Sequence, residues 1–276
     1  MIFLIILGLI WLVFAVVCDW KKREVPDWLN FSLLGFALSY RAFYSIFLWD
    51  ARFFLFGLAG AGIFFILANL FYYSRIFAGG DAKLLIAFGA LLPFADSLES
   101  NLFILIGFIF LLLFSGAIYG TIFSFFLIMK NRKGFSVELR KQFGKMKKII
   151  LISEIFIFCI FLFFVFFNYK ILSFLAVIVF IYPFLFVYAK AVDEGCLIKK
   201  ISVSELSEGD WIAKKMKIGK KIIKPSFMGI TKKEVELIKK KYKDKKILIK
   251  QGIPFVPVFL ISFLILIYIW NRRLFF

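Results

Sequence analysis

The chain has 276 residues, 63% of them hydrophobic, and a mean hydropathy of +0.94. Soluble domains are roughly half apolar, so this excess indicates a polytopic membrane protein. The formal net charge is +19 and histidine is absent, which excludes Ser-His and Cys-His catalysis, histidine metal sites and histidine proton relays.

The chain begins with about 17 apolar residues that no basic segment precedes. Lys21, Lys22 and Arg23 follow this run instead. This order of charge predicts a retained first membrane span with its N-terminus outside, and argues against a cleaved signal peptide.

Eight apolar segments succeed one another along the chain. They lie at about 1–18, 28–48, 53–73, 84–98, 101–129, 149–167, 171–189 and 254–270. A hydrocarbon core of roughly 30 Å needs about 20 apolar residues of helix, and most of these segments are long enough. The fourth is short, because Ala82 to Ala95 gives only about 21 Å of helix.

The distribution of basic residues favours eight crossings. With the N-terminus outside, 31 of the 36 basic residues then fall on the cytoplasmic side, including eight in 130–148 and eighteen in 190–252. Without the fourth crossing, 130–148 would lie outside. The positive-inside rule therefore predicts eight spans with both termini outside. Because topology explains the charge and no aromatic-interleaved basic motif occurs, no nucleic-acid partner is predicted.

Composition divides the chain into five regions. These are a membrane core at 1–129, a basic cytosolic loop at 130–148, a transmembrane hairpin at 149–189 that turns at 168–170, a basic cytosolic insert at 190–252, and a last transmembrane helix and tail at 253–276. The predicted fold class is thus an all-α polytopic membrane protein with a small cytosolic α+β insert.

The insert has its own local signals. Thr231 and Glu234 have the spacing of a capping box, which predicts a helix from about 231. β-Branched residues before Glu208-Gly209-Asp210 predict short strands joined by a turn. With 18 basic and 8 acidic residues, the insert has a net charge of +10, so anionic membrane lipids are an expected partner.

Two aspartates fall at the same predicted level of the membrane. Asp19 ends the first span and Asp81 lies between the third and fourth, 62 residues later, both on the cytoplasmic side. Two carboxyl groups brought together share one proton, so one can activate a water while the other polarises a peptide carbonyl. Gly79 and Gly80, directly before Asp81, would allow backbone to approach closely.

Other interpretations of these residues stay open. Asp27 follows Pro26 and is predicted to be the N-cap of the second span. Asp81 fits the same role for the fourth span, with Lys83 extending to the membrane interface.

Two other classes of function are also compatible with the chain. Asp19, Asp81 and Lys83 would suit an ion-coupled membrane transporter, although no inverted repeat is visible and the charges lie at the inner rim. A non-catalytic component of a pilus or secretion assembly is the third possibility. Arg41, inside the second span, has no explanation at this level.

Three stretches resemble a known family. "AGGDAKLL", residues 78–85, resembles the GxGD-x-K-L signature of type IV prepilin peptidases. "CDWKKREVPDWL", residues 18–29, resembles their first aspartate segment. "GIPFVPVFLISFL", residues 252–264, is similar to the last span of archaeal prepilin and preflagellin peptidases.

This resemblance implies a GxGD aspartic protease with Asp19 and Asp81 as catalytic residues. Gly79, Gly80 and Lys83 would support the motif, although the first glycine of the signature falls on Ala78. It also implies that pilin-like or archaellin precursors lose a short basic leader at the cytoplasmic face of the cell membrane. The cysteine pairs of bacterial relatives are missing, so the resemblance implies peptidase activity alone, without metal or cofactor.

Overall fold

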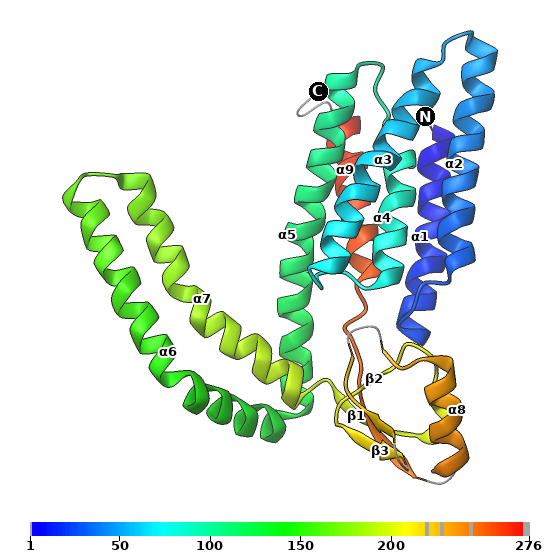
Figure 1. Ribbon diagram of the computed structural model, residues 1–276. Coiled ribbons are helices and arrows are strands. Elements are labelled where there is room, and N and C mark those ends of the chain that lie inside the picture. The colour runs from blue at the N-terminus through cyan, green and yellow to red at the C-terminus, as the bar shows by residue number, and fades with distance from the viewer. Residues whose placement is uncertain (1, 219–220, 227–228, 243–244, 273–276) are drawn as a thin grey trace. The chain divides into compact units, whose positions relative to one another are not determined.

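The computed structural model describes residues 2–218, 221–226, 229–242 and 245–272 (Figure 1). The helices are α1 (Ile2–Lys22), α2 (Asp27–Leu48), α3 (Arg52–Tyr73), α4 (Gly79–Leu91), α5 (Leu98–Lys130), α6 (Arg132–Phe166), α7 (Lys170–Gly195), α8 (Lys232–Lys241) and α9 (Val256–Asn271). The strands are β1 (Ile198–Ser202), β2 (Trp211–Ile212), β3 (Met216–Ile218), β4 (Lys221–Ile223) and β5 (Lys246–Lys250). Of the predicted tail, residues 273–276 lie outside the described ranges.

Helices that suit a membrane dominate the chain. Within the described ranges, six are long and apolar enough to cross one, namely α1, α2, α3, α5, α6 and α7. The shorter α4 and α9 lie at two further predicted spans. The predicted class, a polytopic helical membrane protein with a small α+β insert, is confirmed.

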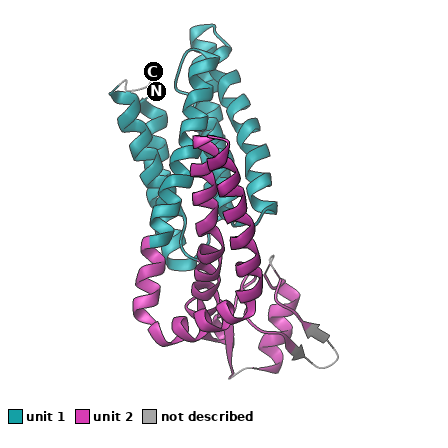
Figure 2. Cartoon of the chain, turned by 90° about the vertical axis from the view of Figure 1, so that its left-hand side faces the viewer, with its two compact units in different colours: residues 1–121, 253–276 teal, residues 122–252 magenta. Residues whose placement is uncertain are grey.

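The chain forms two compact units (Figure 2). Unit 1 contains residues 1–121 and 253–276, and unit 2 contains residues 122–252. The boundary falls within α5. The first and last parts of the sequence therefore fold together in unit 1.

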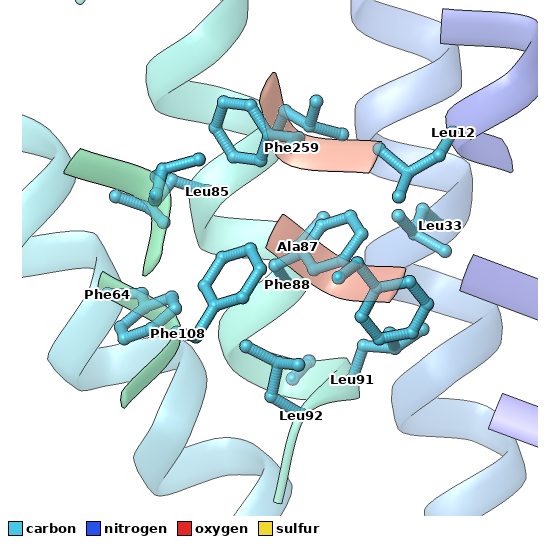
Figure 3. Close-up of a cluster of buried hydrophobic side chains, with 14 of the residues drawn as sticks. Leu12, Leu33, Phe64, Leu85, Ala87, Phe88, Leu91, Leu92, Phe108 and Phe259 are labelled. Atoms are coloured by element: carbon cyan, nitrogen blue, oxygen red, sulfur yellow. The ribbon is translucent and has the colours of Figure 1, made fainter. Parts of the chain in front are cut away.

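The short helix α4 lies in the core of unit 1. It has 13 residues, eight of which are buried. Phe88 on α4 stacks on Phe108 of α5 with ring centres 5.4 Å apart (Figure 3). Phe88 also meets Phe263 of α9 edge-on, with ring centres 5.2 Å apart. A helix that is apolar on all sides either lies in a protein core or spans a membrane, and the buried residues of α4 place it in the core. Burial thus explains why α4 is apolar although it is shorter than the six helices that are long enough to cross a membrane.

Small residues bring α3 and α4 into close contact. A Cβ added at Gly60 would lie 2.2 Å from the carbonyl oxygen of Gly89, and one added at Gly89 would lie 2.4 Å from that of Gly60. Glycine at such positions lets two helix backbones approach closely, which is a common way of packing helices in membranes. This contact fixes one side of α4.

Arg41 on α2 holds the C-terminal end of α4. The side chain is fully buried. Its guanidinium donates to four carbonyl oxygens, those of Ala90 (2.7 Å), Phe53 (2.9 Å), Leu91 (3.1 Å) and Pro93 (2.6 Å). The last carbonyls of a helix have no intrahelical donors and form the negative end of its dipole. Arg41 supplies donors there, so α4 can end inside the protein.

In unit 2, α6 and α7 form an antiparallel hairpin (Figure 1). The turn between them contains Asn168 with φ of 62°, which confirms the predicted hairpin. Residues 132–148, expected to be a loop, are helical and belong to α6. Lys, Arg, Glu and Gln all favour helix, so this basic stretch extends the helix beyond its apolar part.

The insert contains the predicted strands and helix. An antiparallel sheet has the order β1-β5-β2, and β3 pairs with β4 in a separate hairpin. Gly209 has φ of 90° in the segment that leads to β2, as the turn prediction requires. Helix α8 starts after Thr231, whose backbone N–H donates to Glu234 at 3.1 Å, and it buries Val235 and Ile238. These features confirm the capping box.

Candidate active site

Asp19 lies on the buried face of α1. Leu4, Leu12, Ala15 and Asp19 are all buried, and they recur at the spacing of one helix face. The Oδ2 atom of Asp19 accepts a hydrogen bond of 3.0 Å from the backbone N–H of Val256, the first residue of α9. The first N–H groups of a helix lack intrahelical acceptors and favour a nearby negative charge. The start of α9 therefore binds the Asp19 carboxyl group.

Asp81 lies in the first turn of α4 and is less buried than Asp19. Its Oδ2 atom accepts a long hydrogen bond of 3.4 Å from the backbone N–H of Ala78. Gly79 and Gly80 are the first two residues of the helix and do not form a loop. The Asp81 side chain folds back over this turn, as the acidic residue of a capping box does.

The structure brings the two aspartates together. Their carboxyl groups lie within electrostatic range of each other, and α1 contacts α4. Arg23 and Tyr119 also lie within electrostatic range of Asp19. Two carboxyl groups that share a proton provide a base and an acid at one place. A catalytic role for the pair stays a prediction.

Lys83 contacts Asp27, which the sequence predicts to be the N-cap of the second span. Its Nζ atom lies 2.6 Å from Oδ1 of Asp27, the first residue of α2. The N-cap of α2 is Pro26, so the prediction that Asp27 caps this helix is wrong by one position. The ion pair joins the two motif segments, since Asp27 follows Asp19 and Lys83 follows Asp81.

Asn30 is a site residue that sequence reasoning missed. Its side chain is 1% exposed, and its Nδ2 atom donates to the carbonyl oxygen of Gly80 at 3.3 Å. A signal was available, because Asn30, Leu33, Ala37 and Arg41 recur at helical spacing and are all buried on α2. A polar residue on such a face needs a partner inside the protein.

Among the residues that the structure describes, no group of three or more His, Cys, Asp or Glu side chains is placed to hold a metal ion.

The fold and the site define a polytopic membrane protein with a pair of neighbouring aspartates on two helices of one bundle. Residues 6–129 of the chain match the sequence model of the type IV leader peptidase family. The matched stretch contains both Asp19 and Asp81. It confirms the family resemblance that the two aspartate motifs indicate.

Two curated relatives resemble the same chain in part. A preflagellin peptidase of Methanococcus maripaludis is 36% identical over 88 residues, which are 32% of this chain and 38% of the relative. A preflagellin peptidase of Methanocaldococcus jannaschii is 32% identical over 88 residues, which are 32% of this chain and 37% of that relative. The chain thus spans well under half the length of the relatives it matches.

Proposed function

We propose that this protein is a membrane-embedded aspartic endopeptidase that removes short basic leaders from type IV pilin-like or archaellin precursors. One observation carries the proposal: Asp19 and Asp81, from separate motifs, lie on two helices that contact each other, α1 and α4, and within electrostatic range of each other. Both belong to the stretch that matches the type IV leader peptidase family. The names of the two relatives support the same class of substrate.

In this mechanism Asp19 acts first as the general base and Asp81 as the general acid. Asp19, bound to the N-terminus of α9, holds the negative charge, and the shared proton resides on Asp81. The Asp19 carboxylate takes a proton from a water molecule, whose oxygen attacks the peptide carbonyl carbon. Asp81 gives its proton to the carbonyl oxygen. The resulting intermediate breaks when Asp19 returns its proton to the leaving amine and the carbonyl forms again, which restores the proton to Asp81.

Conservative substitution of each aspartate tests this mechanism. Purified full-length protein is incubated with an archaellin precursor, and the rate of leader removal is measured. Asp19→Asn and Asp81→Asn should each lower the rate on the order of 10³-fold, because each removes half of the acid–base pair. The double variant should be no slower than the singles, since residues that act as a unit are non-additive.

A matched control is Asp50→Asn. Asp50 forms an exposed ion pair with Arg52 at 2.7 Å, away from both motifs in the sequence, and its loss should leave cleavage unchanged. Thermal unfolding of every variant in detergent shows whether the fold survives. Full cleavage by either single aspartate variant would refute the mechanism.

The site is proposed to face the cytoplasm. The support is the placement of 31 of the 36 basic residues on one side by an eight-span topology. A precursor helix would then lie in the bilayer while its basic leader stays in water. Protease added to vesicles of known orientation should cut residues 190–252 only from the cytoplasmic side. Cutting from the outside would overturn both the topology and the placement of the site.

The basic insert is proposed to bind anionic lipid headgroups. Helix α8 buries Val235 and Ile238 and carries lysines in its first and last turns. Such a surface attracts anionic membranes and would repel a basic leader. A variant with Lys239, Lys240 and Lys241 changed to Gln should retain fewer anionic lipids in native mass spectrometry of the solubilised protein. Equal lipid retention would contradict this assignment.

No metal takes part in the proposed mechanism. Cleavage should therefore be unaffected by EDTA and by reagents that modify serine or cysteine. A chelator that stops cleavage, with activity restored by added metal, would require a different mechanism.

A further inference from the structure

Two polar contacts connect the first turn of α2 to the N-terminal part of α4. Asp27 Oδ1 lies 2.6 Å from Lys83 Nζ, across 56 residues of sequence. Asn30 Nδ2 donates to the carbonyl oxygen of Gly80 at 3.3 Å, across 50 residues. The two contacts meet α4 on either side of Asp81 in the sequence.

The backbones also lie close at this point. A Cβ added at Gly80 would lie 3.3 Å from the backbone nitrogen of Val25 and 3.4 Å from its Cβ. Val25 is itself buried, two residues before α2 begins. The start of α4 therefore rests directly against the chain that leads into α2.

Asp81 depends on these contacts more than Asp19 does. Asp19 is buried and bonded to α9, whereas Asp81 is partly exposed. In the described part of the chain, the hydrogen bond that Asp81 accepts is the 3.4 Å one from Ala78, within its own turn. Its position is thus set by where the first turn of α4 lies.

Folding stability does not explain the ion pair. The side chains of Lys83 and Asp27 are 38% and 61% exposed, and pairs this exposed contribute little to stability. Orientation is a different matter, because a displacement of about 1 Å at a reacting group lowers rates by up to about 100-fold. A contact of small energy has a large effect when it fixes the place of a catalytic group.

We propose that Asp27, Asn30 and Lys83 are positioning residues, which hold the first turn of α4 against α2 and thereby place Asp81 opposite Asp19. The proposal deepens the proposed function and rests on it. It assigns a role to the motif lysine, and it gives Asp27 a role other than the helix cap that the sequence predicts.

Kinetics of variants test the ion pair. Asp27→Asn and Lys83→Met should each lower kcat about tenfold while KM changes less than about twofold, since substrate binding is untouched. The double variant should be no slower than either single one, because both break the same contact. Lys83→Arg keeps the charge and should stay within about threefold of the unaltered protein.

The Asp50–Arg52 pair is the matched control. Its two charged atoms lie 2.7 Å apart, against 2.6 Å in the Lys83–Asp27 pair. The exposure is also similar, since the side chains of Asp50 and Arg52 are 37% and 72% exposed. Asp50→Asn and Arg52→Met should leave kcat unchanged. Asn30→Leu, which removes the buried donor at nearly constant volume, should lower kcat at least as much as Lys83→Met.

A labelling experiment reads the position of residue 81 without any need for activity. In a background with Cys18, Cys159 and Cys196 changed to Ser, the Asp81→Cys variant is treated with a maleimide. Adding Lys83→Met should change the labelling rate by about fivefold or more, while adding Arg52→Met should not.

The outcomes separate the two proposals. An unaltered protein that cleaves no precursor refutes the proposed function, and the labelling rates then still decide the positioning. The positioning proposal is overturned if Lys83→Met changes neither kcat nor labelling, if the losses of the single variants multiply in the double one, or if Lys83→Arg is as slow as Lys83→Met.

Discussion

The two ends of α4 are held in different ways, although the helix has only 13 residues. At the C-terminal end, the fully buried Arg41 donates to four carbonyl oxygens and lies 4.4 Å from the ring centre of Phe53. At the N-terminal end, the contacts are a partly exposed ion pair between Lys83 and Asp27 and one hydrogen bond from Asn30.

This difference suggests that the Arg41 end of α4 contributes mainly to stability and the Asp81 end mainly to the proposed activity. A buried charge is tolerable only when its hydrogen bonds are satisfied, so the Arg41 end is a structural element with little freedom. In the proposed mechanism the Asp81 end admits a substrate and water, which agrees with its accessible polar groups and weaker contacts. Changes at the Arg41 end should therefore lower stability, and changes at the Asp81 end should lower the rate.

The largest effect is expected at the C-terminal end. Arg41→Met should destabilise the protein by about 3–5 kcal/mol, because buried carbonyl oxygens lose their donors. Arg41→Lys should be intermediate, since an ammonium has three donors and no planar fork. Thermal unfolding of the purified protein in one detergent measures both.

The control for this prediction is Arg52→Met. Arg52 is 72% exposed, and its loss should change stability by less than about 0.5 kcal/mol. If Arg41→Met unfolds at the same temperature as the unaltered protein, the C-terminal end does not depend on Arg41.

A smaller loss of stability is expected along the side of α4. Gly60→Ala and Gly89→Ala should each destabilise by about 1–3 kcal/mol, because the added methyl meets a carbonyl oxygen of the facing helix at 2.2 or 2.4 Å. Gly62→Ala, also on α3, is the control, since nothing lies within 4 Å of its added Cβ. Equal unfolding temperatures for all three variants would mean that the α3–α4 contact is looser than described.

Much of the fold could be predicted from composition alone. Runs of apolar residues locate the membrane helices, because hydrocarbon requires both length and hydrophobicity. The start of α4 was missed by five residues, since the prediction placed the segment at 84–98 and the helix begins at Gly79. A glycine pair disfavours helix locally, and burial against α2 outweighs that preference here.

The sequence predicts the two aspartates of the candidate site but not the residues that surround them. Asp19 and Asp81 stand out because carboxyl groups near hydrocarbon are rare. Their surroundings depend on pairings across 50 or more residues, such as Asn30 with Gly80 and Asp27 with Lys83. The Val256 N–H that binds Asp19 is a backbone group 237 residues away, and sequence carries no sign of it.

The smallest effect is expected at Gly80, in the first turn of α4, where Gly79 provides a neighbouring control. A methyl group at Gly80 would meet the backbone of Val25 at 3.3 Å, which requires a shift of a few tenths of an ångström. A methyl group at Gly79 would meet only the ring of Tyr72, at 3.8 Å. Each Gly→Ala change also favours the helix by up to about 1 kcal/mol, which offsets the strain of the shift.

Gly80→Ala should therefore lower kcat by about threefold to tenfold without loss of stability, because the displaced turn carries Asp81. Gly79→Ala should have unchanged kinetics and equal or slightly higher stability. Steady-state cleavage and thermal unfolding are measured on the same preparations of both variants. If Gly80→Ala loses stability but keeps its rate, this end of α4 behaves like the Arg41 end, and the distinction between the two fails.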